Sequence, residues 1–112
     1  MTGRSIHTSL AGGRWRELTL MEQLANIGSE VGRAARERAR DDEQRLTGAV
    51  ERTLELFDLT LDDPRWMGRY GEIARAREVV CDYLVGDNEF GSTPASLERY
   101  FVPFAMAARR DR

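Results

Sequence analysis

Hydrophobic residues recur at intervals of three and four positions from residue 20 onward, the spacing of one face of an α-helix. The clearest run steps by 4, 3, 4 and 3 through Leu20, Leu24, Ile27, Val31 and Ala34. The opposite side of this helix carries Gln23, Asn26, Glu30 and Arg33. Thr19 precedes the run and Glu22 stands three residues after it, as in a capping box. The pattern predicts a first helix over residues 19–40.

Small residues flank the hydrophobic stripe of this helix at Ala25, Gly28 and Gly32. A glycine inside a helix costs about 1 kcal/mol relative to alanine. We therefore expect a neighbouring helix to approach closely along this flank and to compensate for that cost.

Two further helices follow, each opened by an aspartate. The pair Asp41-Asp42 favours a break and a second helix over 42–61, although one continuous helix across the pair is the alternative. The hydrophobic face of this second helix comprises Leu46, Ala49, Val50, Thr53, Leu54, Leu56, Phe57 and Leu61. Asp63 followed by Pro64 predicts a third helix over 64–85. Its inward residues are expected to be Trp66, Tyr70, Ile73, Val80, Cys81 and Leu84.

A fourth helix is predicted over 94–108, after the turn-rich segment 86–92. Thr93 and Pro94 repeat the cap-then-proline start. One face then carries Leu97, Tyr100, Phe101, Phe104 and Ala108. Pro103 lacks a backbone N–H, so the helix is expected to bend there or to end near Val102.

The pattern as a whole indicates an all-α fold, a bundle of about four helices forming one domain over 18–112. Residues 1–17 are glycine-interrupted and predict a flexible arm, with Trp15 anchored on the bundle. The chain has 112 residues, 41% of them hydrophobic, which suits one compact domain. It contains no apolar run of membrane-spanning length and no secretion signal, so we expect a cytoplasmic protein without a membrane partner.

The charge pattern does not single out a partner. The net charge is -2 and all 17 basic residues are arginine, a bias that a GC-rich genome explains. Arg33, Arg36 and Arg40 are spaced so that they share one side of the first helix. Such a stripe could hold the phosphates of RNA or DNA. Interleaved acidic residues and the dipole at the helix C-terminus favour instead a charged solvent face.

Arg77 is the one charged residue predicted near the centre of a hydrophobic face. An unpaired buried charge costs several kcal/mol, so we expect Glu30 or Asp58, or a set of helix-end carbonyls, to meet it. Arg77 would then either form an internal ion pair that fixes helix register or extend its guanidinium group to the surface. The alternative is an arginine that grips an anionic ligand.

The acidic residues Glu78 and Asp82 lie one turn apart on the third helix and are candidate magnesium ligands. Magnesium needs several convergent oxygen ligands, which one such pair does not supply. The E-E-x-x-E motif of all-α nucleotide pyrophosphohydrolases of the MazG type is absent, and Glu78 and Asp82 are four residues apart rather than spaced as in the E-x-x-D motif of that family. A metal-dependent nucleotide hydrolase therefore requires a site assembled between chains, which is the least favoured interpretation.

Nucleophilic catalysis finds no candidate pair in the sequence. The only histidine, His7, falls in the predicted arm, and Cys81 is expected inside, where thiols are usually inert. We identify no catalytic residue and expect no cofactor, which favours a protein that is not an enzyme.

Three segments resemble stretches of a family of short bacterial and archaeal proteins of unknown function. They are WRELTLMEQLANIGSEVGRA, ERTLELFDLTLDDPRW and AREVVCDYLVGDNEFGST. The resemblance covers residues 15 to about 108 and implies an intact helical domain without implying an activity. Because four short helices bury limited apolar area, the sequence predicts an interaction or assembly module that forms a homo-oligomer or binds another protein. The alternative is an accessory subunit that binds RNA or DNA through Arg33, Arg36 and Arg40.

Overall fold

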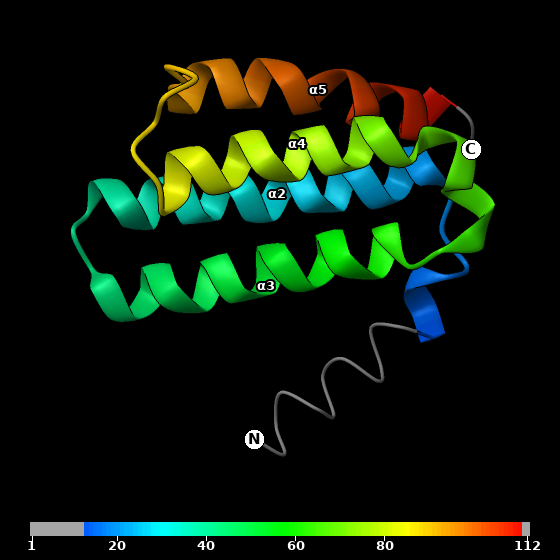
Figure 1. The fold of residues 1–112 in the computed structure, drawn as a ribbon, viewed down its shortest axis with the longest axis horizontal. Helices are drawn as coiled ribbons and strands as arrows, with labels where there is room; N and C mark the ends of the chain where they lie inside the picture. The colour runs from blue at the N-terminus through cyan, green and yellow to red at the C-terminus, as the bar shows by residue number, and fades with distance from the viewer. Residues whose placement is uncertain (1–12, 111–112) are drawn as a thin grey trace.

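The computed structural model describes residues 13–110, and every regular element among them is a helix. In chain order these are α2 (Leu20–Ala39), α3 (Glu43–Leu61), the 3-10 helix η1 (Pro64–Arg69), α4 (Tyr70–Leu84) and α5 (Pro94–Arg110) (Figure 1). The all-α bundle expected from the sequence is confirmed. Among the described residues, no helix is long and apolar enough to cross a membrane.

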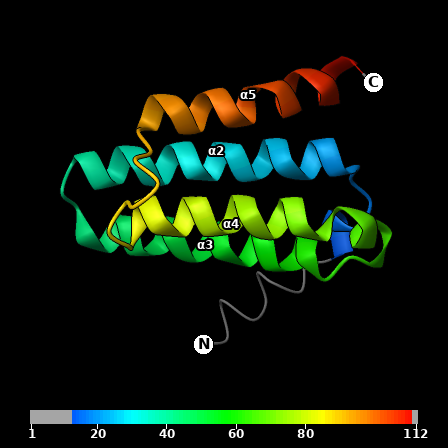
Figure 2. The ribbon, with the colours of Figure 1, turned by 45° about the horizontal axis from the view of Figure 1, so that its top comes forward.

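α2 lies at the centre of the arrangement, and successive long helices run in opposite directions (Figures 1 and 2). α3 and α5 both pack extensively on α2, and α4 packs mainly on α3. Figure 2 shows α5 on one side of α2 and the α3–α4 pair on the other. α5 therefore depends on α2 as its one extensive neighbour among the described elements.

The helix starts follow the local sequence signals. Thr19 Oγ1 accepts a hydrogen bond from the Glu22 N–H, and Glu22 Oε1 accepts one from the Thr19 N–H, which completes the predicted capping box. Asp41 adopts a left-handed conformation with φ 61°, and Asp42 then caps α3 by accepting from the Arg45 N–H. The alternative of one continuous helix across this pair was wrong, because a residue with positive φ ends the helical path.

The predicted third helix over 64–85 is two elements. Asp63 and Pro64 do start a helical turn, but Trp66 has φ −104° and ψ 18°, and a regular α-helix begins only at Tyr70. A 3-10 connector is typical where the chain must reverse within a few residues, here from α3 into α4. Tyr70, expected to point inward, is exposed.

α5 continues through Pro103 as far as Arg110, so the alternative of an end near Val102 was wrong. Pro103 is exposed, and its lost hydrogen bond therefore lies where water can replace it. The inward face of α5 buries Leu97, Phe101 and Ala108 against α2.

The first helix buries the whole of its predicted face: Leu20, Leu24, Ile27, Val31 and Ala34. The core is completed by residues from the other helices, among them Phe57, Ile73, Val80, Leu97 and Phe101. Residues 64–85 differ from expectation in that Ala76 and Tyr83 of α4 are buried, whereas Trp66 of η1 and Cys81 of α4 are only partly covered.

A buried hydrogen-bond chain ties the first described residues to the bundle. Gln23, expected on the polar side of α2, is fully buried instead. Its Nε2–H donates to the Trp15 carbonyl at 2.8 Å, and its Oε1 accepts from Trp66 Nε1–H at 2.8 Å. Trp15 Nε1–H donates in turn to Thr60 Oγ1 at 2.9 Å. Trp15 is thus anchored as expected, while residues 1–12 of the predicted arm, including His7, lie outside the described residues.

Candidate interaction surface

A groove of about 670 Å³ runs between α2 and α5. The α2 wall is built mostly from small side chains, which are Ala25, Gly28, Ser29, Gly32, Ala35 and Ala39. The α5 wall includes Ala95, Glu98, Val102 and Ala105. Small residues on one side and an exposed helix face on the other leave a channel that residues 13–110 do not fill.

Gly28 sets the distance between the two helices. A Cβ atom built on Gly28 would lie 2.6 Å from Phe101 Cβ, well inside normal contact. A glycine here therefore allows the root of the Phe101 side chain to rest directly on the α2 backbone. Close approach along this flank of α2 was expected from the sequence, and α5 is the helix that makes it.

The residues on the groove side of α5 recur at helical spacing, as do the buried residues on its inward face. Ala95, Glu98, Val102, Ala105 and Arg109 follow one another in steps of 3, 4, 3 and 4, and we call them the α5 seam. A smaller hollow of about 190 Å³ shares Ala25 and Ala105 with the groove and includes Arg109. Four of the five seam residues line the groove, and the fifth, Arg109, lines the smaller hollow. Val102 is 43% exposed, and Met106 beside the seam is 52% exposed.

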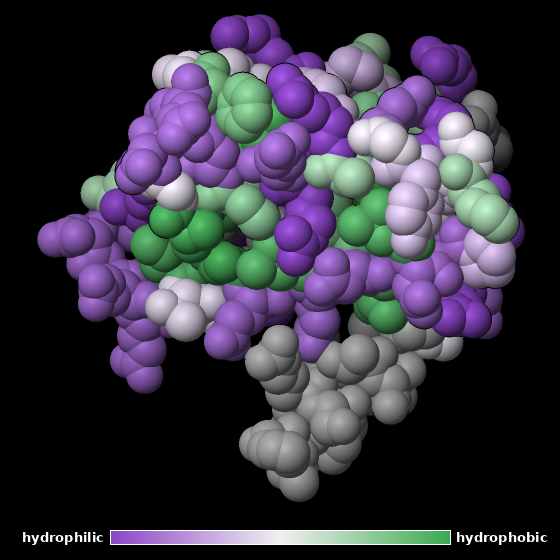
Figure 3. Space-filling model, viewed as in Figure 1, coloured by the Kyte–Doolittle hydropathy of each residue, from purple (hydrophilic) through white to green (hydrophobic). Residues whose placement is uncertain are grey.

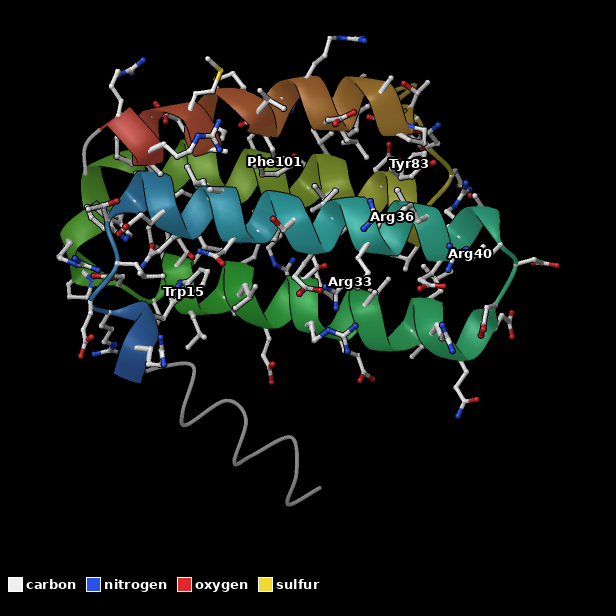
Figure 4. All side chains as sticks on the ribbon, turned by 180° about the vertical axis from the view of Figure 1, so that it is seen from behind. Trp15, Arg33, Arg36, Arg40, Tyr83 and Phe101 are labelled. Carbon is white, nitrogen blue, oxygen red and sulfur yellow. The ribbon has the colours of Figure 1, made fainter. Side chains whose placement is uncertain are left out.

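The predicted arginine stripe belongs partly to this groove. Arg33 and Arg36 line it, and neither forms an ion pair within the described part of the chain. Arg33 also borders a second hollow, between α2 and α3 (Figure 4). Arg40 lies at the end of α2, 4.0 Å from a Glu37 carboxylate oxygen. The acidic residue Glu98 faces the same groove.

Arg77 lies at the edge of the core and not at its centre. Its Nε–H donates to Asp58 Oδ1 at 3.1 Å, and the side chains of Arg77 and Asp58 are 36% and 62% exposed. Ala76 occupies the buried position that the sequence assigned to Arg77. The partner is one of the two carboxylates that the sequence suggested.

Glu30, the other carboxylate suggested for Arg77, pairs with Arg52 across the α2–α3 interface at 3.3 Å. The Arg77–Asp58 pair lies over a shallow hollow of about 770 Å³ between α3 and α4, which also contains Glu78 and Cys81. Figure 3 shows hydrophobic surface along this junction interrupted by charged side chains. The hollow therefore presents charges that are already paired, unlike the groove between α2 and α5.

The two candidate metal ligands, Glu78 and Asp82, have other partners. Glu78 lies 3.7 Å from Arg75 Nη1 in an exposed ion pair. Asp82 accepts hydrogen bonds from the Glu89 and Phe90 N–H groups at 2.8 and 3.0 Å, so it holds the loop before α5. Nowhere in residues 13–110 do three or more His, Cys, Asp or Glu side chains gather as metal ligands. Within the described chain, the metal interpretation of Glu78 and Asp82 finds no support.

Two further groups show how the environment changes titration. Burial raises the pKa of the Cys81 thiol, which keeps it protonated and unreactive. Asp63 is almost fully buried, and the hydrogen bonds that it accepts from Arg65 lower its pKa. Arg65 Nη2–H also donates to the Leu18 carbonyl at 3.0 Å. Asp63 and Arg65 therefore form a structural tie at the turn, distant from the groove.

No family model, curated protein or solved structure matches this chain. The resemblance to short helical proteins therefore stays a prediction. The groove between α2 and α5 is the feature that the sequence analysis did not assemble. Its α2 wall was visible as small residues beside a hydrophobic stripe, and the α5 seam was visible as a second run at spacing 3 and 4.

Proposed function

We propose that this protein is a helical assembly module that associates with a second copy of itself through the groove between α2 and α5. The observation that carries the proposal is the unfilled channel of about 670 Å³ whose α5 wall exposes Val102. Water on such a surface is released when another helix covers it, at about 25 cal/mol per Å² of apolar area. The sequence analysis expected four short helices to bury a limited apolar area, and an interaction surface of this kind would bury more of it.

The small net charge of the protein favours binding to a second copy of itself over binding to a strongly charged partner. A net charge of -2 produces little repulsion between two copies. The groove contains both signs, with Arg33 and Arg36 near Glu98. A surface that presents both signs can be complementary to itself.

Binding of RNA or DNA through the arginine stripe is the alternative, and the geometry supports it less well. Glu98 lies in the same groove as Arg33 and Arg36, and Arg40 is close to Glu37. A phosphate backbone would meet these carboxylates along with the guanidinium groups. Nucleic-acid binding by this surface should weaken steeply with added salt and should disappear when all three arginines are changed to alanine.

We also expect the module to act in the cytoplasm. Cys81 is a free thiol among the described residues, and reducing compartments keep thiols free.

Sedimentation velocity over a range of protein concentrations tests the proposal. A monomer has a mass of 12.8 kDa, and we expect a concentration-dependent shift to twice that mass. Val102→Glu places a charge in the groove and should return the protein to monomer. Val85→Glu is the matched control, since Val85 is also an exposed valine, at 65%, but does not line the groove.

Circular dichroism of both variants should show unchanged helix content, because glutamate is a good helix former at Val102 in α5 and Val85 lies just after the end of α4. A wild-type protein that stays monomeric at the highest soluble concentration refutes self-association. If Val85→Glu dissociates the dimer and Val102→Glu does not, the interface between the two copies lies outside this groove.

A further inference from the structure

We infer that the occupant of the groove is the α5 helix of the second copy, lying antiparallel to the first so that the two α5 seams meet. This inference rests on the proposed self-association and adds the partner element, its direction and its register. The seam Ala95, Glu98, Val102, Ala105 and Arg109 has the 3 and 4 spacing of a helix that packs lengthwise along another helix.

One register pairs four of the five seam residues. When two antiparallel copies of α5 cross midway between residues 103 and 104, Val102 faces Ala105 of the partner subunit. The same crossing sets Glu98 against Arg109 of the partner subunit, because both pairs are centred on that point. The two-fold axis then repeats each contact, so every copy supplies one carboxylate and one guanidinium. In this single register, apolar residues meet in the middle of the two helices and opposite charges meet at both ends.

A parallel arrangement of the same helices is disfavoured by charge. It would place Glu98 beside Glu98 of the partner subunit, and Arg109 beside Arg109 of the partner subunit. Like charges at an interface oppose association. Glu98 and Arg109 form no ion pair within residues 13–110, so both remain available for a partner.

The shape of the channel also suits a helix. Ala95 and Ala105 on α5, with Gly32 on α2, leave the space that a second backbone needs. α5 spans Pro94–Arg110, which corresponds to a rod about 25 Å long. The hollow between α3 and α4 offers no such match, since Arg77 and Asp58 pair across it.

Charge reversal tests the direction of the helices. Glu98→Arg and Arg109→Glu should each weaken the dimer by about tenfold, because each substitution turns two attractive contacts into two repulsive ones. The double variant exchanges the charges and should restore the wild-type dissociation constant to within about threefold. Arg110→Glu is the matched control, since it makes the same change one residue away from the seam, and it should leave the dimer intact.

Disulfide cross-linking tests the register directly, in a Cys81→Ser background. Glu98→Cys and Arg109→Cys proteins are oxidised separately and as a mixture. The antiparallel register predicts a cross-linked dimer in the mixture and little in either protein alone, since two copies of residue 98 would lie about 16 Å apart.

A dimer that cross-links through Glu98→Cys alone has parallel helices and overturns the inference. The inference is also overturned if Val102→Glu dissociates the dimer, the charge reversals do not weaken it, and the mixture of cysteine variants forms no cross-linked dimer. In both cases the proposed self-association survives. A wild-type protein that never dimerises refutes the proposed function itself, so the two failures are distinguishable.

Discussion

The contact between Gly28 and Phe101 makes a prediction with an unusual sign. Alanine in place of a helical glycine normally stabilises a protein by about 0.5 to 1 kcal/mol, because the unfolded chain loses freedom. At Gly28 the added Cβ would lie 2.6 Å from Phe101 Cβ and 2.9 Å from its Cγ. Carbon atoms rest about 3.5 to 4.0 Å apart, so α5 must move outward by about 1 Å.

Phe101 cannot yield by rotating, since the clash is with the root of its side chain. Forcing an extra methyl into such a contact costs about 1 to 3 kcal/mol. The gain in helix propensity offsets part of that cost, and Gly28→Ala should lower the free energy of unfolding by about 1 to 2 kcal/mol. The assay is urea unfolding followed by far-UV circular dichroism at one fixed protein concentration.

Gly48→Ala is the control for this experiment. Gly48 also lies inside a helix, but its nearest neighbour beyond the helix backbone is the flexible end of Arg52 at 3.6 Å. Gly48→Ala should therefore raise the free energy of unfolding by about 0.5 to 1 kcal/mol. If Gly28→Ala stabilises the protein as much as Gly48→Ala does, α5 is not held against the α2 backbone and the reasoning about the groove fails.

Three other predictions concern the polar interactions. Gln23→Leu should lower the free energy of unfolding by about 1 to 3 kcal/mol, because Trp66 Nε1–H loses its acceptor; an unchanged urea midpoint would contradict this. Asp63→Asn should cost about 1 kcal/mol at neutral pH. The pKa of Asp63 is lowered by folding, so its contribution is present above about pH 4 and is lost as the pH falls through the lowered pKa. Urea titrations should therefore show that the free energies of unfolding of the wild-type protein and of Asp63→Asn differ at neutral pH and become similar at acid pH. Arg77→Ala should change stability by less than about 1 kcal/mol, because its pair with Asp58 is exposed; a larger loss in thermal unfolding would show that the pair is buried in solution.

The helix boundaries were largely readable from the sequence because they depend on local chemistry. Thr19 with Glu22 marked the start of α2, and Asp42 and Asp63 marked the next two starts. Each signal acts within a few residues of the chain. The buried face of α2 was equally clear, since one run of aliphatic residues repeats over four turns without interruption.

Tertiary contacts decided the features that the sequence did not reveal. Gln23 is polar, and its burial depends on Trp15 and Trp66, which meet it from other parts of the chain. Arg77 was placed too deep because large residues were assumed to point inward, whereas Ala76 occupies that position. A small residue gives a weak periodic signal, and only the packing of α4 on α3 shows which side of the helix is covered.

The candidate surface was half readable for the same reason. The small residues of α2 indicated a close neighbour but not which helix it would be. Arg33, Arg36 and Arg40 were grouped by spacing on one helix, while the groove depends on what α5 adds beside them, including Glu98. Chemistry that is shared between helices cannot be read from the period of one helix.

The position of α5 has a consequence for motion. A helix with one extensive neighbour can detach while the rest of the bundle stays folded, so its amide hydrogens exchange with solvent through local opening. α2, packed on both sides by α3 and α5, opens only when the whole bundle does. Hydrogen exchange should therefore be fastest in α5 and slowest in α2. Because the groove exists only while α5 is docked, a bound second copy would slow exchange in α5 more than in any other helix.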